Sequence, residues 1–157
     1  MSNSKPLLFV AKWISLGFGS GLAPKAPGTF GTLVGIPFVF LFAELTVIWY
    51  LFVTGLFFLL GVWAAHYYSD HLGEHDHSSI VWDEVVGYMI TMAFVPLEWS
   101  WVVLGFVLFR LFDIWKPWPI RLLDKHVHGG FGVMIDDALA GVYAAVTLLA
   151  IQIIITG

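Results

Sequence analysis

The sequence predicts an all-α fold: a small polytopic bundle of membrane helices with short helical hairpins and one polar face. Only 11% of its 157 residues are charged and 59% are hydrophobic, whereas an ordinary soluble domain has about 25% charged residues. Long stretches without any Asp, Glu, Lys, Arg or His also occur, and a spanning helix needs about 20 mainly apolar residues. No repeat or linker divides the chain, so we expect a single domain over residues 1–157.

The N-terminal segment 1–31 is expected to lie at the membrane surface. Residues 5–16 are apolar with Lys5 and Lys12 among them, which favours an amphipathic helix in the interface. A glycine-rich loop follows. No small-residue cleavage site follows the apolar residues, so the segment is not expected to be a signal peptide.

The spans and hairpins come from the charge-free stretches. Residues 45–65 and 138–157 are each long enough to cross a bilayer. The stretch 26–43 is shorter, because Pro27-Gly28 predicts a turn at its start, and its helical part is expected over 32–43. Two short apolar arms form a second predicted hairpin with its tip at Pro96-Leu97-Glu98: residues 85–97 and 99–109.

The basic residues predict the orientation. All seven Lys and Arg residues lie in segments 1–31, 66–84 and 110–137, and the predicted hairpin tips near Glu44 and Glu98 contain none. The positive-inside rule therefore places the polar face in the cytoplasm of a bacterial inner membrane or its equivalent. The net charge of −4 and the scattered bases argue against a nucleic-acid partner.

Two pairs of adjacent acids stand out on this face. Asp83-Glu84 begins an apolar helix, and Asp136-Asp137 follows a glycine-rich loop at the head of the last span. The simplest interpretation is that the helix dipole favours acids in a first turn. Ionisable groups beside a membrane-buried segment are expensive, however, unless a charged group interacts with them. A functional site is therefore the competing hypothesis.

A basic helix is the expected counterpart of the acids. Arg110, Asp113 and Lys116 recur every three residues and should share one helix face. They could form a ladder of ion pairs at the membrane surface, with snorkelling bases. If this face instead meets the acid pairs, the site combines oxygen ligands for a hard cation with cationic groups for an anion. Magnesium and phosphate fit that chemistry.

Two further segments carry weaker signals. Backbone N–H groups and hydroxyls in the glycine-rich segment 17–32, together with Lys25, could surround a phosphate. That segment lacks the spacing of a P-loop, so a plain loop stays open. The stretch from His66 to His77 is rich in His and acids, but it has no HExxH motif and the chain has no Cys. A hydrated helix end is favoured there over a zinc or haem site.

Four blocks in order carry a resemblance to a known family. They are Gly17-x-Gly19-x-Gly21 with Ala26-Pro27-Gly28-Thr29-x-Gly31, Ile80-Val81-Trp82-Asp83-Glu84, Phe109-Arg110-x-x-Asp113-x-x-Lys116-Pro117-x-Pro119-Ile120, and Gly129-Gly130-x-Gly132-Val133-Met134-x-Asp136-Asp137. Together they closely resemble the phosphatidylglycerophosphatase A family, over residues of about 13 to 145.

The resemblance implies a Mg²⁺-dependent lipid phosphatase of the bacterial inner membrane. Its partners would be the membrane and a phospholipid substrate, phosphatidylglycerophosphate, which it converts to phosphatidylglycerol in phospholipid biosynthesis. The expected catalytic acids are Asp83, Glu84, Asp113, Asp136 and Asp137. The expected metal ligands are Asp83, Glu84, Asp136 and Asp137, with Asp76 added by its place before the Asp-Glu pair. Phosphate is expected to bind Arg110 and Lys116, then Lys25 and Thr29.

The residues also exclude other phosphatase chemistries. The sequence has no Asp-x-Asp pair, no Cys and no Pro-Ser-Gly-His block, which leaves metal-assisted hydrolysis with water or an Asp as the attacking group. A small membrane transporter or cation-binding carrier is the alternative function, but its acids should line both sides or the midplane of the membrane. A non-catalytic membrane subunit is a further alternative.

Overall fold

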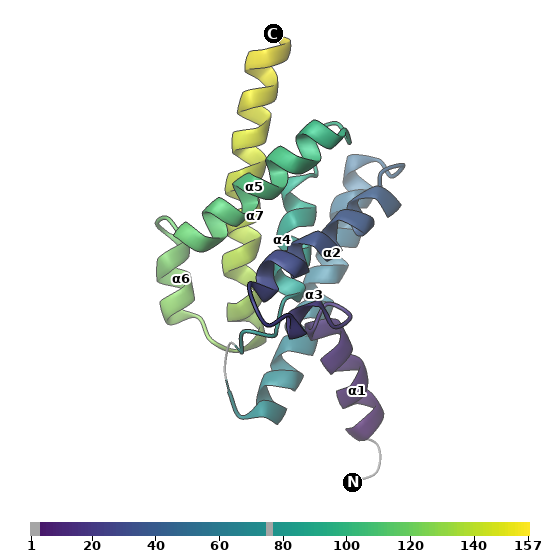
Figure 1. Ribbon diagram of the computed structural model, residues 1–157, viewed down its shortest axis with the longest axis vertical. Helices are drawn as coiled ribbons and strands as arrows, with labels where there is room; N and C mark the ends of the chain where they lie inside the picture. The colour runs from purple at the N-terminus through teal and green to yellow at the C-terminus, as the bar shows by residue number, and fades with distance from the viewer. Residues whose placement is uncertain (1–3, 75–76) are drawn as a thin grey trace.

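Residues 4–74 and 77–157 are described by a computed structural model, and every regular element in these ranges is a helix (Figure 1). The elements in order are α1 (Ser4–Ser15), the 3₁₀ turn η1 (Ser20–Leu22), α2 (Pro27–Leu41), α3 (Val47–Leu72), α4 (Trp82–Thr91), α5 (Trp99–Trp115), α6 (Ile120–His126) and α7 (Gly129–Thr156). The all-α prediction is confirmed for the described part of the chain.

The short helix α4 forms the centre of the bundle. It has only ten residues, and eight of them are buried, because α2, α3, α5 and α7 all pack against it (Figure 1). Its large side chains Trp82, Tyr88 and Met89 are almost completely inaccessible. The element that begins with the acid pair Asp83-Glu84 is therefore the most enclosed helix of the protein.

Helices α4 and α7 touch through their backbones. A Cβ atom on Gly87 would lie only 2.8 Å from the Asp137 carbonyl oxygen and 2.5 Å from the Phe109 ring, and a Cβ on Gly141 would overlap the Gly87 carbonyl. Glycine at these two positions lets the helices approach more closely than any other residue would allow. This approach brings the start of α4 against α7.

Buried polar side chains in the core donate to main-chain carbonyls. The Tyr50 hydroxyl donates to the Met89 carbonyl at 2.8 Å, and the Tyr88 hydroxyl donates to the Val102 carbonyl at 2.8 Å. The Trp82 indole N–H donates to the Phe57 carbonyl at 3.0 Å. Each bond satisfies a group that would be costly to bury alone, and each joins two different helices.

Two helices are long and apolar enough to cross a membrane. They are α3, with 26 residues, and α7, with 28 residues. Large apolar side chains on both face outward, including Ile48, Phe52 and Leu59 on α3 and Val146 and Ile154 on α7. Helices α2, α4 and α5 have 15, 10 and 17 residues and are shorter than a full crossing. Two full spans with shorter hairpin arms match the sequence prediction.

The turns of the two hairpins lie together. A pocket of about 380 Å³ is lined by residues from both turns, including Ala43 and Leu45 between α2 and α3, and Phe94 and Pro96 between α4 and α5. Helices α2 and α4 both begin near the acid pair and run toward these turns. The predicted tips near Glu44 and Glu98 therefore share one end of the bundle, away from the acids.

The sequence analysis placed the starts of two helices wrongly and missed a third helix. Helix α2 begins at Pro27, where a missing N–H costs nothing, and continues through Pro37 instead of starting at residue 32. Helix α7 begins at Gly129, so the expected glycine-rich loop is its first turns. A Cβ on Gly130 would collide with the Val62 carbonyl of α3, so the glycines serve packing. Helix α6 was not predicted.

Candidate active site

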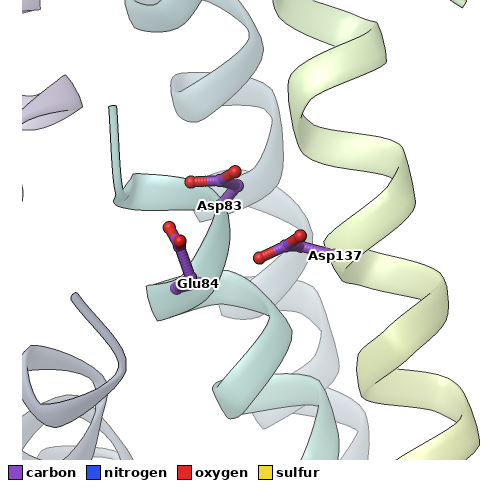
Figure 2. A group of neighbouring side chains, drawn as sticks. All are labelled: Asp83, Glu84 and Asp137. Carbon is purple, nitrogen blue, oxygen red and sulfur yellow. The ribbon is translucent and has the colours of Figure 1, made fainter. Parts of the chain in front are cut away.

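Three carboxylates from two helices converge at the end of the bundle opposite the hairpin turns. Asp83 and Glu84 lie in the first turn of α4, and Asp137 reaches toward them from α7 (Figure 2). One oxygen atom of each lies within 4.8 Å of the others. The Asp83 and Asp137 side chains are buried, and Glu84 is 13% exposed. We call these three residues the acidic triad.

The acidic triad has unsatisfied oxygen atoms. Asp83 Oδ1, Glu84 Oε2 and Asp137 Oδ2 are buried and have no hydrogen-bond partner among the residues that the structure describes. Burial, and next the neighbouring carboxylates Glu84 and Asp137, raise the pKa of Asp83; burial also raises the pKa of Glu84. Buried charges of like sign are costly unless a cation compensates them. The donor set, all carboxylate oxygen, fits a hard divalent cation.

Arg110 on α5 flanks the acidic triad. Its guanidinium pairs with Asp113 one turn further along α5, and Nη1 lies 3.9 Å from Glu84 Oε1. The Arg110 and Asp113 side chains are 17% and 11% exposed, and Arg110 Nε is buried without a partner in the described part of the chain. The site therefore contains a guanidinium that is held by acids on two helices and retains a free donor.

Lys116 lies just beyond the end of α5 and does not continue the predicted ladder. Its backbone is left-handed, with φ of 47°, and its Nζ donates to Asp124 Oδ1 at 2.8 Å and to Asp136 Oδ2 at 2.7 Å. Burial lowers the pKa of Lys116, but these hydrogen bonds outweigh burial and raise it. Lys116 is therefore a stable positive charge beside the site.

The adjacent acids Asp136 and Asp137 have different neighbours. Successive residues of a helix point about 100° apart, so Asp137 faces α4 while Asp136 faces Lys116. Asp136 Oδ1 also accepts the Asp137 backbone N–H at 3.0 Å. The structure thus brings Asp137 into the acidic triad and holds Asp136 in a separate cluster with Lys116 and Asp124.

The start of α2 lies against the same site. A Cβ on Gly28 would overlap the Glu84 carboxylate and contact the Arg110 guanidinium. Glycine at this position therefore lets the first turn of α2 reach the charged groups. Lys25 is exposed and Thr29 is half-buried. Within the described residues, neither side chain makes a hydrogen bond or ion pair with the acids.

The histidine-rich segment from His66 to His77 is not part of the acidic triad, and the structure describes it except for residues 75 and 76. His66 Nε2 lies 3.6 Å from Asp70 Oδ2, and His77 Nε2 lies 3.7 Å from Glu74 Oε2, with all four side chains well exposed. These contacts are typical of a hydrated helix end. Asp76, an expected metal ligand, lies outside the described residues. In the ranges that are described, the acidic triad is the one group of three His or acidic residues close enough to share an ion.

Asp124 is the site residue that the sequence did not predict. It lies on α6, a helix of only seven residues, which is too short to leave a clear hydrophobic period. Its spacing of eight residues from Lys116 matches no helix or strand contact. Only the reversal of the chain between α5 and α6 brings the two together.

Fold and site together define the class of this protein. It is a helical, membrane-associated protein whose charged site can hold a divalent cation beside an anionic group. The chain belongs to the phosphatidylglycerophosphatase A family, whose profile matches residues 13–152. The resemblance carried by its four sequence blocks is thereby confirmed.

Two curated relatives are half identical to the chain. The phosphatidylglycerophosphatase A of Escherichia coli (strain K12) is 50% identical over 133 residues, which cover 84% of this chain and 77% of that protein. The phosphatidylglycerophosphatase A of Haemophilus influenzae (strain ATCC 51907 / DSM 11121 / KW20 / Rd) is 50% identical over 141 residues, which cover 88% and 86%. No solved structure matches the chain.

Proposed function

We propose that this chain hydrolyses phosphatidylglycerophosphate to phosphatidylglycerol and phosphate, with Mg²⁺ held by Asp83, Glu84 and Asp137. The reaction is that of its family and of the two relatives, so the chain is a phosphatidylglycerophosphatase, a phosphoric monoester hydrolase. The observation that supports the metal assignment is the convergence of three buried carboxylates with unpaired oxygen atoms.

The cation and the bases have complementary roles. When bound, Mg²⁺ supplies positive charge close to the phosphoryl oxygens. Arg110 binds the phosphate through donors that its pairing with Asp113 and Glu84 leaves free, because a guanidinium can contact two phosphate oxygens at once. Lys116 contributes a second positive charge, and Asp136 fixes its position.

Backbone groups at the start of α2 complete the phosphate site. The first N–H groups of a helix have no partner within the helix and bind anions well. Pro27 has no N–H, and the Thr29 and Phe30 N–H groups donate to the Ala26 carbonyl. The backbone donor for the phosphate is therefore the N–H of Gly28, which lies against Glu84 and Arg110. Thr29 adds its hydroxyl, and Lys25 attracts the anionic lipid from the exposed loop before α2.

The position of the site along α7 suits a lipid substrate. From Asp137 to Thr156, α7 runs for about 28 Å at 1.5 Å per residue, nearly the thickness of the hydrocarbon core. The site then lies at the headgroup layer, and the substrate keeps its acyl chains in the bilayer. The distribution of bases supports a site on the cytoplasmic face of the bacterial inner membrane.

The experiment is a phosphate-release assay on purified protein in detergent micelles containing phosphatidylglycerophosphate. We expect release with Mg²⁺, none after EDTA, and recovery when Mg²⁺ is restored. Asp137→Asn should lower kcat/KM by about 100-fold or more, because it removes a charged ligand of the cation. A folded sample that releases no phosphate with Mg²⁺ present would contradict the proposal.

A matched control separates the triad from acids in general. Asp70→Asn removes an exposed carboxylate that pairs with His66. We expect it to keep full activity and an unchanged Mg²⁺ requirement. Equal losses in Asp137→Asn and Asp70→Asn would show that the loss does not report on the triad.

A further inference from the structure

Lys116 holds its ammonium between two carboxylates that belong to different helices. Nζ lies 2.8 Å from Asp124 Oδ1 on α6 and 2.7 Å from Asp136 Oδ2 on α7. An ammonium group has three donors, so these contacts leave one donor for a ligand. The contact with Asp136 is explained by the position of Asp136 beside the acidic triad. The contact with Asp124 on α6 has no such explanation in the proposed reaction.

The two carboxylates hold Lys116 in different ways. The Asp136 side chain is 8% exposed, and its other oxygen accepts the Asp137 N–H, so it is fixed to α7. The Asp124 side chain is 34% exposed. An ion pair this exposed contributes little to folding stability, and a role in stability is a poor explanation for Asp124.

The Lys116 side chain needs two anchors to have a defined position. It is long and flexible, and one carboxylate leaves its ammonium free to rotate about that contact. Carboxylates on two sides fix both the place of Nζ and the direction of its remaining donor. The backbone at Lys116 is left-handed, with φ of 47°, which is unfavourable for a residue with a side chain. This backbone conformation directs the side chain toward the two carboxylates.

We propose that Asp124 is a positioning residue of the phosphatase site and acts through Lys116. It holds the ammonium beside Asp136 so that the third donor is directed to the substrate phosphate before the substrate binds. Preorganised donors of this kind cost no rearrangement during the reaction. The inference rests on the proposed function, because that function gives Lys116 its phosphate ligand, and it extends the site onto α6.

The first test is the pair Asp124→Asn and Asp124→Glu in the micelle assay. Asp124→Asn keeps the shape and removes the charge, and we expect kcat/KM to fall by about tenfold, the typical effect of losing one charged hydrogen bond. The Mg²⁺ concentration for half-maximal activity should stay unchanged, since the acidic triad is intact. Asp124→Glu restores the charge from an exposed position with room for a longer side chain and should recover most of the activity.

The second test is a double-mutant cycle with Lys116→Met. If Asp124 acts through Lys116, Asp124→Asn should cause no further loss in the Lys116→Met background. Multiplying losses would overturn the proposal, as would full activity of Asp124→Asn alone. If Asp124→Asn unfolds at a lower temperature than the parent, the activities of the cycle are compared well below that temperature, where all four proteins are folded.

The outcomes also separate this proposal from the proposed function. A loss in Lys116→Met with full activity in Asp124→Asn keeps Lys116 as a phosphate ligand and removes Asp124 from the site. Full activity in Lys116→Met overturns both the role of Lys116 and the positioning by Asp124, while the Mg²⁺ requirement of the parent still tests the triad. Asp70→Asn serves as the control for removal of an exposed acid.

Discussion

Each cation at the site is held by two carboxylates. Arg110 pairs with Asp113 and Glu84, and Lys116 pairs with Asp136 and Asp124. These pairs fix the positive groups before a ligand arrives, which lowers the cost of ordering them during catalysis. They also leave a net negative charge among the buried groups, which a bound divalent cation would offset.

Arginine and lysine should not be interchangeable at position 110. Arg110→Lys keeps the charge but loses the planar guanidinium that contacts two acids and, in the proposed function, also binds the phosphate. We therefore expect kcat/KM to fall by about tenfold to 100-fold. The control is Arg121→Lys on the exposed side of α6, which should behave as the parent. Steady-state kinetics on both variants measure the difference, and equal activities would remove Arg110 from the phosphate site.

At the scale of elements, the contact between α4 and α7 determines the geometry of the acidic triad. Asp83 and Glu84 come from one helix and Asp137 from the other, and the helices meet at Gly87 and Gly141. Any change in their separation therefore also changes the distance between the carboxylates.

Adding one methyl group at this contact should damage both stability and activity. In Gly87→Ala the new Cβ meets the Asp137 carbonyl and the Phe109 ring, so we expect a loss of about 1–3 kcal/mol in stability and a clear fall in kcat/KM. Gly55→Ala on α3 is the matched control, because its Cβ meets nothing within 4 Å, and alanine favours a helix over glycine. Thermal unfolding and the phosphate assay check both variants, and a neutral Gly87→Ala would contradict this packing.

The sequence predicts the long elements better than the short ones. Charge-free stretches identify α3 and α7, since their outward faces are apolar over a membrane length. The start of α7 is missed because Gly129, Gly130 and Gly132 are typical of a loop. In the structure, Gly130 allows close approach to α3, Gly132 allows close approach to the preceding Val127, and Gly129 has a positive φ of 76°. Helix α6 is missed because seven residues carry too little periodicity.

The candidate site is predictable in composition but only partly in arrangement. Acids beside apolar helices identify Asp83, Glu84 and Asp137, because such charges require partners. Because Asp136 and Asp137 are adjacent in sequence, both are expected to bind the same metal ion. Successive residues of a helix point in different directions, however, so the two side chains have different neighbours. The roles of Gly28 and Asp124 depend on contacts between elements, which no local pattern encodes.

At the scale of the whole molecule, charge is separated along the bundle. The acidic triad and its bases lie at one end and the two hairpin turns at the other. With α3 and α7 long enough to cross a bilayer, this separation makes the orientation of the protein testable.

The absence of cysteine from the chain makes orientation simple to measure. Glu44→Cys adds one thiol at a hairpin turn, and Lys125→Cys adds one on α6. In intact spheroplasts, a membrane-impermeant maleimide should label Glu44→Cys, whereas Lys125→Cys should react only after permeabilisation, if the basic face is cytoplasmic as we propose. The parent chain is the unlabelled control, and the reverse pattern would place the site on the outer face.

The distance along α7 from the acidic triad to the C-terminal end of the helix sets the depth of the site in the membrane. This depth determines whether the rate depends on the bulk concentration of the substrate or on its concentration within the membrane surface. A site at the headgroup layer meets its substrate by diffusion in two dimensions, so the relevant quantity is the mole fraction of substrate in the surface. Adding inert lipid or detergent at constant total substrate should therefore lower the rate by dilution within the surface. In a membrane, the rate then depends on how crowded the surrounding leaflet is with the substrate lipid.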